Sequence, residues 1–197
     1  MRLPLIALLT SATAALSPAM AECDGRADIE AAFVKQATSK GWRSVITSKD
    51  ANGASQEEIY EFLNPDRMYR KITTRGESIE TIGISKWAWT NIGGGYSELK
   101  PQFAQMVSNR LQQAFVAPKV SVAFNCLGTK TVEGKEYAAY QTTPEKQDGG
   151  TMLARTIYLD PATGLPAYNI IGDPDGAGEP LREESFTYPD KITIEKP

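Results

Sequence analysis

The stretch ETIGISKWAWTNIGGGYSEL, residues 80–99, contains two apolar segments joined by a short polar turn, then three glycines and a segment that starts with tyrosine. Short alternating segments separated by so few residues predict antiparallel hairpins. Side chains alternate between the two faces of a strand, so Trp87 and Trp89 are expected to point to the same face. We expect them to form one aromatic platform, which either packs beneath the helix that begins at Pro101 or lines a ligand-binding cleft.

Alternation with a period of two extends outward from this stretch to most of the chain. The expected strands are residues 42–48, 57–63, 67–74, 77–84, 86–92, 119–127, 136–142, 152–160, 165–171, 181–188 and 191–195. Two amphipathic helices interrupt them. The first covers residues 27–39, with Ile29, Phe33, Val34 and Ala37 on its apolar face. The second runs from Pro101 to Val116, and its apolar stripe consists of Phe103, Met106, Val107, Leu111, Ala114 and Phe115.

This pattern predicts an α+β fold that is mostly β, with about eleven strands and two helices. A meander of this length with one apolar face is expected to form a strongly curved antiparallel sheet, either an open or a half barrel. Two helices cannot cover such a sheet completely. We therefore expect a partly open concave face, or an apolar cavity beneath the helices.

The first 21 residues, MRLPLIALLTSATAALSPAMA, have the features of a secretory signal peptide: one arginine, a short apolar stretch and the triplet Ala19-Met20-Ala21. Cleavage is expected after Ala21, which leaves residues 22–197 as a single curved-sheet domain. The product is expected to be periplasmic or secreted and not embedded in a membrane. With 21 basic and 24 acidic residues, the chain has a net charge of −3, which argues against nucleic acid as a partner.

Cys23 and Cys126 are the two cysteines of the chain. In an oxidising compartment such a pair predicts a disulfide bond, here one that closes a loop of about 100 residues. Two free thiols or a metal-binding pair are the alternatives. A zinc site is disfavoured, because two cysteines without histidine supply too few ligands.

The chain contains no histidine, which removes imidazole bases and histidine-dependent triads from consideration. A catalytic role would rest on carboxylates such as Glu57, Glu58, Glu183 and Glu184. Neighbouring residues on a strand point to opposite faces, so neither pair converges by local spacing. We therefore expect no enzyme activity, no metal and no cofactor.

The segments ETIGISKWAWTNIGGGYSEL, with a helix directly after it, and IYLDPATGLPAYN resemble the periplasmic lipoprotein-carrier superfamily, whose members include LolA, LolB and the LppX group. The resemblance covers residues 42–195 and implies a half-open antiparallel barrel, covered by helices, that holds acyl chains in an apolar cleft. The chain departs from this family in its cysteine pair and in lacking a recognisable basic loop residue for handing cargo on. These departures leave the cargo and the pathway open.

Two interpretations of function follow. In the first, the protein is a soluble periplasmic binding or carrier protein for an apolar or lipid-like ligand, such as a lipoprotein acyl chain. The candidate ligand-binding residues are Trp87, Trp89, Met68, Ile72, Ile82, Met106, Phe124, Ile157 and Phe186. In the second, the protein is a non-catalytic envelope scaffold with a core filled by its own side chains, and it binds another protein through its surface or strand edges.

Overall fold

The structure is a computed structural model that describes residues 23–50, 52–147 and 150–197. The expected signal peptide, residues 1–21, lies outside the described residues. No helix among the described residues is both long enough and apolar enough to cross a membrane.

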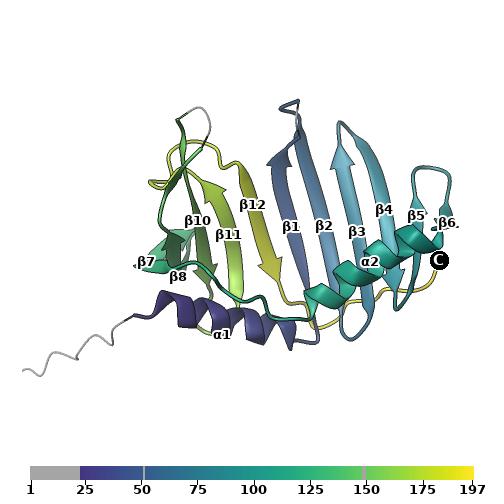
Figure 1. Cartoon of the computed structure of the whole chain (residues 1–197), viewed down its shortest axis with the longest axis horizontal. Helices are drawn as coiled ribbons and strands as arrows, with labels where there is room; N and C mark the ends of the chain where they lie inside the picture. The colour runs from purple at the N-terminus through teal and green to yellow at the C-terminus, as the bar shows by residue number, and fades with distance from the viewer. Residues whose placement is uncertain (1–22, 51, 148–149) are drawn as a thin grey trace, which may run out of the picture.

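A single antiparallel sheet forms the body of the molecule. Its strands are β1 (Gly41–Lys49), β2 (Ser55–Leu63), β3 (Arg67–Thr74), β4 (Glu77–Ile84), β5 (Trp87–Asn91), β6 (Tyr96–Glu98), β7 (Phe124–Val132), β8 (Lys135–Thr142), β9 (Glu145–Lys146), β10 (Met152–Leu159), β11 (Pro166–Gly172) and β12 (Arg182–Thr187). Their order is β6-β5-β4-β3-β2-β1-β12-β11-β10-β8-β7, and β9 pairs with β10 off this path. The sheet is curved and unclosed, which confirms the expected half barrel (Figure 1).

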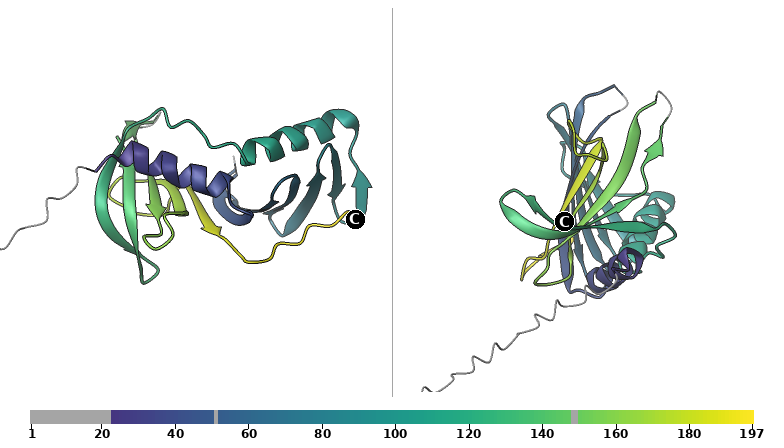
Figure 2. Two further views of the ribbon diagram at one scale, coloured as in Figure 1. Left: turned by 90° about the horizontal axis from the view of Figure 1, so that it is seen from below. Right: turned by 90° about the vertical axis from the view of Figure 1, so that its left-hand side faces the viewer.

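The two helices, α1 (Gly25–Ala37) and α2 (Pro101–Ala114), lie on the same face of the sheet, which we call the inner face. The C-terminal segment after β12 runs along the opposite side of β1 to β5, which we call the outer face (Figure 2). Helix α1 covers the half of the sheet formed by β7 to β11, and α2 covers the half formed by β1 to β5 (Figure 1). The middle of the inner face therefore lies between the two helices.

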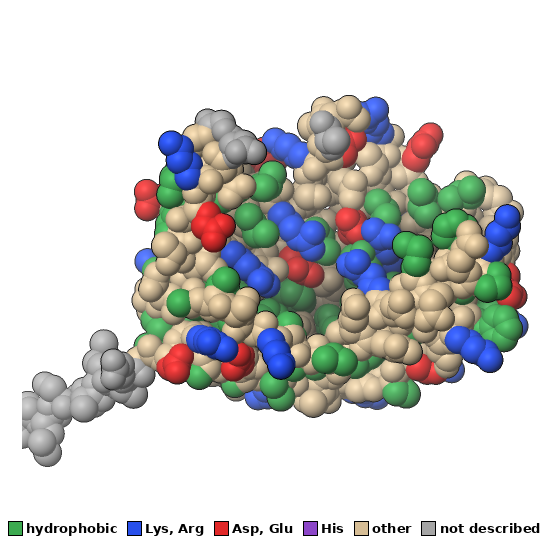
Figure 3. Space-filling view, viewed as in Figure 1, with side chains coloured by type: hydrophobic (Ala, Val, Ile, Leu, Met, Phe, Trp, Pro, Cys, Tyr) green, Lys and Arg blue, Asp and Glu red, His purple; other side chains and the backbone are tan. Residues whose placement is uncertain are grey.

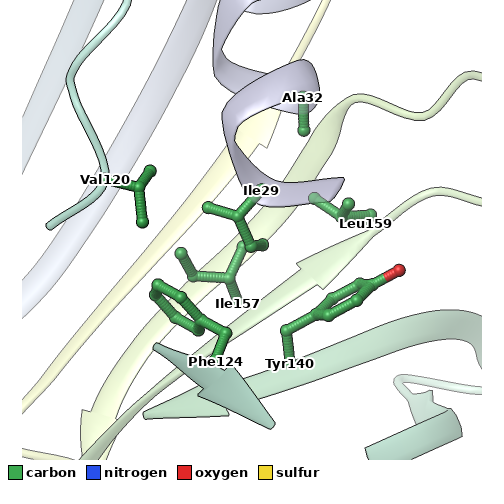
Figure 4. Close-up of a cluster of buried hydrophobic side chains, with 7 residues drawn as sticks. All are labelled: Ile29, Ala32, Val120, Phe124, Tyr140, Ile157 and Leu159. Atoms are coloured by element: carbon green, nitrogen blue, oxygen red, sulfur yellow. The ribbon is translucent and has the colours of Figure 1, made fainter. Parts of the chain in front are cut away.

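Helix α1 begins after Asp24, whose carboxylate accepts a hydrogen bond of 3.0 Å from the Ala27 amide and so caps the helix. Its buried side chains Ile29 and Ala32 pack on a cluster that consists of Val120, Phe124, Tyr140, Ile157 and Leu159 (Figure 4). The disulfide between Cys23 and Cys126 joins the start of this helix to β7, as predicted. Of the residues expected on the apolar face, Ile29 and Ala37 are buried and Phe33 packs on the cluster, whereas Val34 is half exposed.

Helix α2 and the residue after it pack on the sheet through most of the expected stripe, namely Val107, Leu111, Ala114 and Phe115, and also through the small side chains of Ala104 and Ser108. Ala104, Ser108 and Leu111 are its buried residues, whereas Phe103 and Met106 are exposed. The close approach depends on Gly83 of β4, because a Cβ there would lie 2.7 Å from Val107 Cγ1. Because Gly83 has no side chain, Val107 of the helix packs directly against β4 at this point.

The structure differs from the predicted strands in several places. The short strands β6 and β9 were not among the expected ones. Residues 191–195 form no strand; the alternation there arises because Ile192 and Ile194 both pack on the outer face beside Ile82 and Trp89. The strand expected over 119–127 begins only at Phe124 and continues to Val132, where a turn with positive φ at Glu133 and Gly134 leads into β8. Two positive φ values in a two-residue loop are typical of the type I′ hairpin turn.

Candidate functional site

A cleft with a volume of about 400 Å³ occupies the inner face between the two helices. Figure 3 shows basic and acidic side chains gathered in this hollow. The lining residues are Phe33, Gln36, Trp42, Ser44, Ile46, Tyr60, Phe62, Arg110, Gln113, Ala114, Val116, Pro118, Arg155, Asn169, Arg182, Glu184 and Phe186. Volumes of this size are ordinary for small-molecule sites. We call this region the inner cleft.

Aromatic side chains from β1, β2 and β12 form the apolar part of the inner cleft. The ring centroids of Trp42 and Phe62 lie 5.0 Å apart, and the Phe115 ring packs edge-on against Trp42 at 5.2 Å. Phe186 stands on the neighbouring strand, opposite Ser44 in the register. These positions follow from strand alternation, since residues paired across neighbouring strands project from the same face.

Three arginines enter the inner cleft from three different elements: Arg155 from β10, Arg182 from β12 and Arg110 from α2. Arg155 Nε donates a hydrogen bond of 2.8 Å to Asn169 Oδ1, and Asn169 Nδ2 donates one of 3.1 Å to Glu184 Oε2. Arg182 Nη2 lies 3.8 Å from the same Glu184 oxygen. The lining of the inner cleft therefore contains three guanidinium groups and one carboxylate.

The Arg155 guanidinium is partly removed from water. Burial, reinforced by the nearby Arg182, lowers the pKa of the Arg155 guanidinium, while the Glu184 carboxylate acts in the opposite direction. The partner that contacts Arg155 directly is the neutral Asn169 amide. Placing a guanidinium away from water without a direct anionic partner has a free-energy cost.

A second polar group borders the inner cleft on β2 and β3. Arg70 Nη2 lies 2.7 Å from Glu58 Oε2, and the Tyr60 hydroxyl donates a hydrogen bond of 2.9 Å to the same oxygen. Burial raises the pKa of Glu58, but the hydrogen bonds from Arg70 and Tyr60 outweigh it, so the net shift is downward. The guanidinium carbons of Arg110 and Arg70 lie 4.7 Å and 5.3 Å from the centroid of the Tyr60 ring.

The candidate residues from the sequence do not converge on one site. Five of them, Met68, Ile72, Phe124, Ile157 and Phe186, project from the inner face, and of these Phe186 lines the inner cleft. Phe124 and Ile157 are packed beneath α1, and Met68 is packed beside α2. Ile72 lies farther along the inner face, opposite Ile79 of β4.

The aromatic platform lies on the outer face, so the expectation that it packs beneath the helix after Pro101 is wrong. Trp87 and Trp89 do share a face, as predicted, together with Ile82. Trp89 and Ile82 are buried against Ile194 of the C-terminal segment, whereas Trp87 is half exposed. Both faces of this half of the sheet carry apolar side chains, so alternation defines which residues share a face but not which face the helix covers.

The expectation that Met106 binds ligand is also wrong, because Met106 lies on the side of α2 that faces away from the sheet and 67% of its surface is exposed. The expectation of a purely apolar cavity is also wrong, because the inner cleft combines aromatic residues with arginines. Sequence reasoning missed Trp42 and all three arginines. A signal for Arg155 was present, since it stands two residues from both Leu153 and Ile157 and therefore shares their face.

The described residues contain no group of three or more histidine, cysteine or acidic side chains that could hold a metal ion.

Comparison with solved structures identifies the fold. The chain matches the lipoprotein LppX of Mycobacterium tuberculosis with a TM-score of 0.55 and 9% identity, over 87% of this chain and 98% of LppX. This likeness shows that the protein has an LppX-like half-barrel fold, as the resemblance implied. No family model matches the sequence, and no curated protein sequence is significantly similar to it.

Two further solved structures match with TM-scores below 0.5. A LolA superfamily protein of Nitrosomonas europaea matches with a TM-score of 0.34 and 13% identity, over 85% of this chain and 93% of that protein. MucB from the MucA/MucB complex of Pseudomonas aeruginosa matches with a TM-score of 0.41 and 14% identity, over 83% of this chain. The chain spans 56% of the length of that MucB chain.

Proposed function

We propose that the protein is a non-catalytic periplasmic binding or carrier protein that holds an apolar or lipid-like ligand in the inner cleft. The observation that carries this proposal is the cleft of about 400 Å³ between the two helices, whose lining includes the aromatic side chains of Trp42, Phe62 and Phe186. Apolar side chains around an open cleft favour the binding of an apolar ligand. The expected export signal and the disulfide support an oxidising compartment.

Native mass spectrometry of the purified mature protein, followed by extraction with organic solvent, tests the proposal directly. A co-purified acyl lipid supports a carrier. A protein that is free of lipid after gentle purification, and that binds no fatty-acid-like probe saturably, contradicts it.

Tryptophan fluorescence provides a second test with matched variants. Trp42 lines the inner cleft, whereas Trp87 and Trp89 lie on the outer face. A fatty-acid-like probe should therefore change the emission of the wild-type protein and of Trp87→Phe, but not that of Trp42→Phe. Retention of the full response in Trp42→Phe, with its loss in Trp87→Phe, would place the ligand on the other face and refute the assignment.

The scaffold interpretation keeps one observation in its favour. The sheet is unclosed, and β6 and β7 stand at the two ends of its strand order. Most side chains of β7 are exposed, so its free edge is open to pairing with a strand of another protein. A lipid-free protein that captures an envelope protein through this edge would favour this second function.

A further inference from the structure

We propose that the ligand of the inner cleft is an amphiphile with an anionic head group, a carboxylate or a phosphate, that binds between Arg110, Arg155 and Arg182. This inference rests on the proposed function and adds the chemical class of the ligand. A guanidinium group presents a planar set of N–H donors that matches carboxylate and phosphate oxygens, often with two hydrogen bonds at once.

The balance of charge around the inner cleft supports an anion. Its lining contains three arginines and one glutamate, although the whole chain has a net charge of −3. The adjacent Arg70 and Glu58 pair with each other and leave this local excess unchanged. Positive charge is therefore concentrated in the inner cleft.

The contacts of the individual arginines point the same way. In residues 23–50, 52–147 and 150–197, no carboxylate lies within 4.0 Å of the Arg110 or the Arg155 guanidinium. Arg110 lies over the Tyr60 ring, and Arg155 is half-buried and bonds to a neutral amide. A ligand anion would supply the missing countercharge and offset the cost of burying Arg155.

The apolar part of the ligand also has a place in the same cleft. Trp42, Phe62 and Phe186 line the cleft together with the three arginines. The neutral groups Ser44, Gln36 and Gln113 add hydrogen-bonding atoms to the lining. Aromatic residues next to guanidinium groups fit a molecule with an alkyl chain and a charged end, and they fit a bare ion less well.

Isothermal titration of the mature, disulfide-bonded protein tests this inference. The probes are dodecanoate, dodecyl phosphate, the neutral ester monododecanoylglycerol and inorganic phosphate, with each amphiphile kept below its micelle concentration. The variants are Arg155→Gln and Arg110→Gln. Arg110 is exposed, so Arg110→Gln should leave the fold intact. It keeps the test valid if Arg155→Gln fails to fold. Arg43→Gln is the control, because Arg43 of β1 is paired with Glu61 and projects from the outer face.

We expect the anionic amphiphiles to bind at least about tenfold more tightly than the neutral ester, as a charged hydrogen bond contributes about 1.5–3 kcal/mol. Arg110→Gln and Arg155→Gln should abolish this preference, and Arg43→Gln should retain it. The tighter of dodecanoate and dodecyl phosphate identifies the head group.

Equal binding of the neutral ester and the anions in all variants would overturn the inference and leave the proposed function standing. Binding of inorganic phosphate as tight as that of dodecyl phosphate would support the arginine contacts and overturn the apolar ligand. Absence of binding by every probe would overturn the proposed function and the inference with it.

Discussion

Replacing Gly83 by alanine should loosen α2, which forms one wall of the inner cleft. The new Cβ would lie 2.7 Å from Val107 Cγ1 and 3.0 Å from Met68 Cγ, whereas ordinary contacts begin at 3.4 Å. Overpacking of this kind costs about 1–3 kcal/mol. Alanine also restricts the unfolded chain, which returns about 0.4–1 kcal/mol. We therefore expect a net loss of about 0.5–2 kcal/mol in the free energy of unfolding, measured by urea denaturation and far-UV circular dichroism.

Two further variants make this prediction specific. Gly94→Ala is the control, because a Cβ at Gly94 meets no atom within 4 Å, and its stability should stay within about 0.5 kcal/mol of wild type. Val107→Ala removes the closest contact and leaves the one of 3.0 Å with Met68 Cγ, so adding Gly83→Ala to it should cost less than it does in the wild type. The proposed packing of Val107 of α2 against Gly83 of β4 would be refuted by a Gly83→Ala protein that is as stable as wild type. It would also be refuted if the stability losses of the two single variants simply added up in the double variant.

Three other predictions address the core, the disulfide and one ionised group. Leu111→Ala should lower the free energy of unfolding by about 2–5 kcal/mol, because Leu111 is buried. Met106→Asp should change it by less than about 0.5 kcal/mol, because Met106 is exposed. Similar losses in the two variants would show that α2 presents a different face to the sheet. Replacing Cys23 and Cys126 by serine should cost about 2–5 kcal/mol, and hydrogen exchange should show that α1 loses protection before the sheet does; unchanged exchange in α1 would contradict this. Because the pKa of Glu58 is lowered in the folded state, ionised Glu58 stabilises the fold above the ordinary glutamate pKa of about 4.3, and this stabilisation disappears as the pH falls through the folded-state pKa. Glu58→Gln should therefore weaken the acid dependence of the free energy of unfolding, measured by urea titrations at several pH values. The same pH dependence in the wild type and in Glu58→Gln would contradict this prediction.

Patterns within single segments predicted much of the fold. Alternation placed Trp87 and Trp89 on one face, and two cysteines in a chain that was expected to be exported predicted the bond between Cys23 and Cys126. The strand predicted at residues 191–195 is absent, because Ile192 and Ile194 pack on one side of the segment and produce a period of two without pairing to another strand. A period of two reports one-sided burial, whichever structure causes it.

The candidate site was less accessible to sequence reasoning, because it depends on how distant elements meet. Arg110, Arg155 and Arg182 are separated by tens of residues, and no local spacing relates them. The strand order brings β12 next to β1 and β11, and this places Arg182 and Arg155 on the same inner face as Trp42. Side chains that are unrelated in the sequence are therefore gathered in one cleft.

By itself, the sequence determined a curved antiparallel sheet with two helices, because alternation and helical spacing record which side chains of each segment are buried. The tertiary structure alone decided which face of the sheet the helices cover. Both faces of β3 to β5 are apolar in part, and Gly83 admits α2 on the inner one while Ile192 and Ile194 cover the other. As a result, Trp89 is buried on the outer face, and Trp42 lines the inner cleft together with three arginines. The surroundings of a side chain depend on long-range packing, which the neighbouring residues in the sequence do not encode.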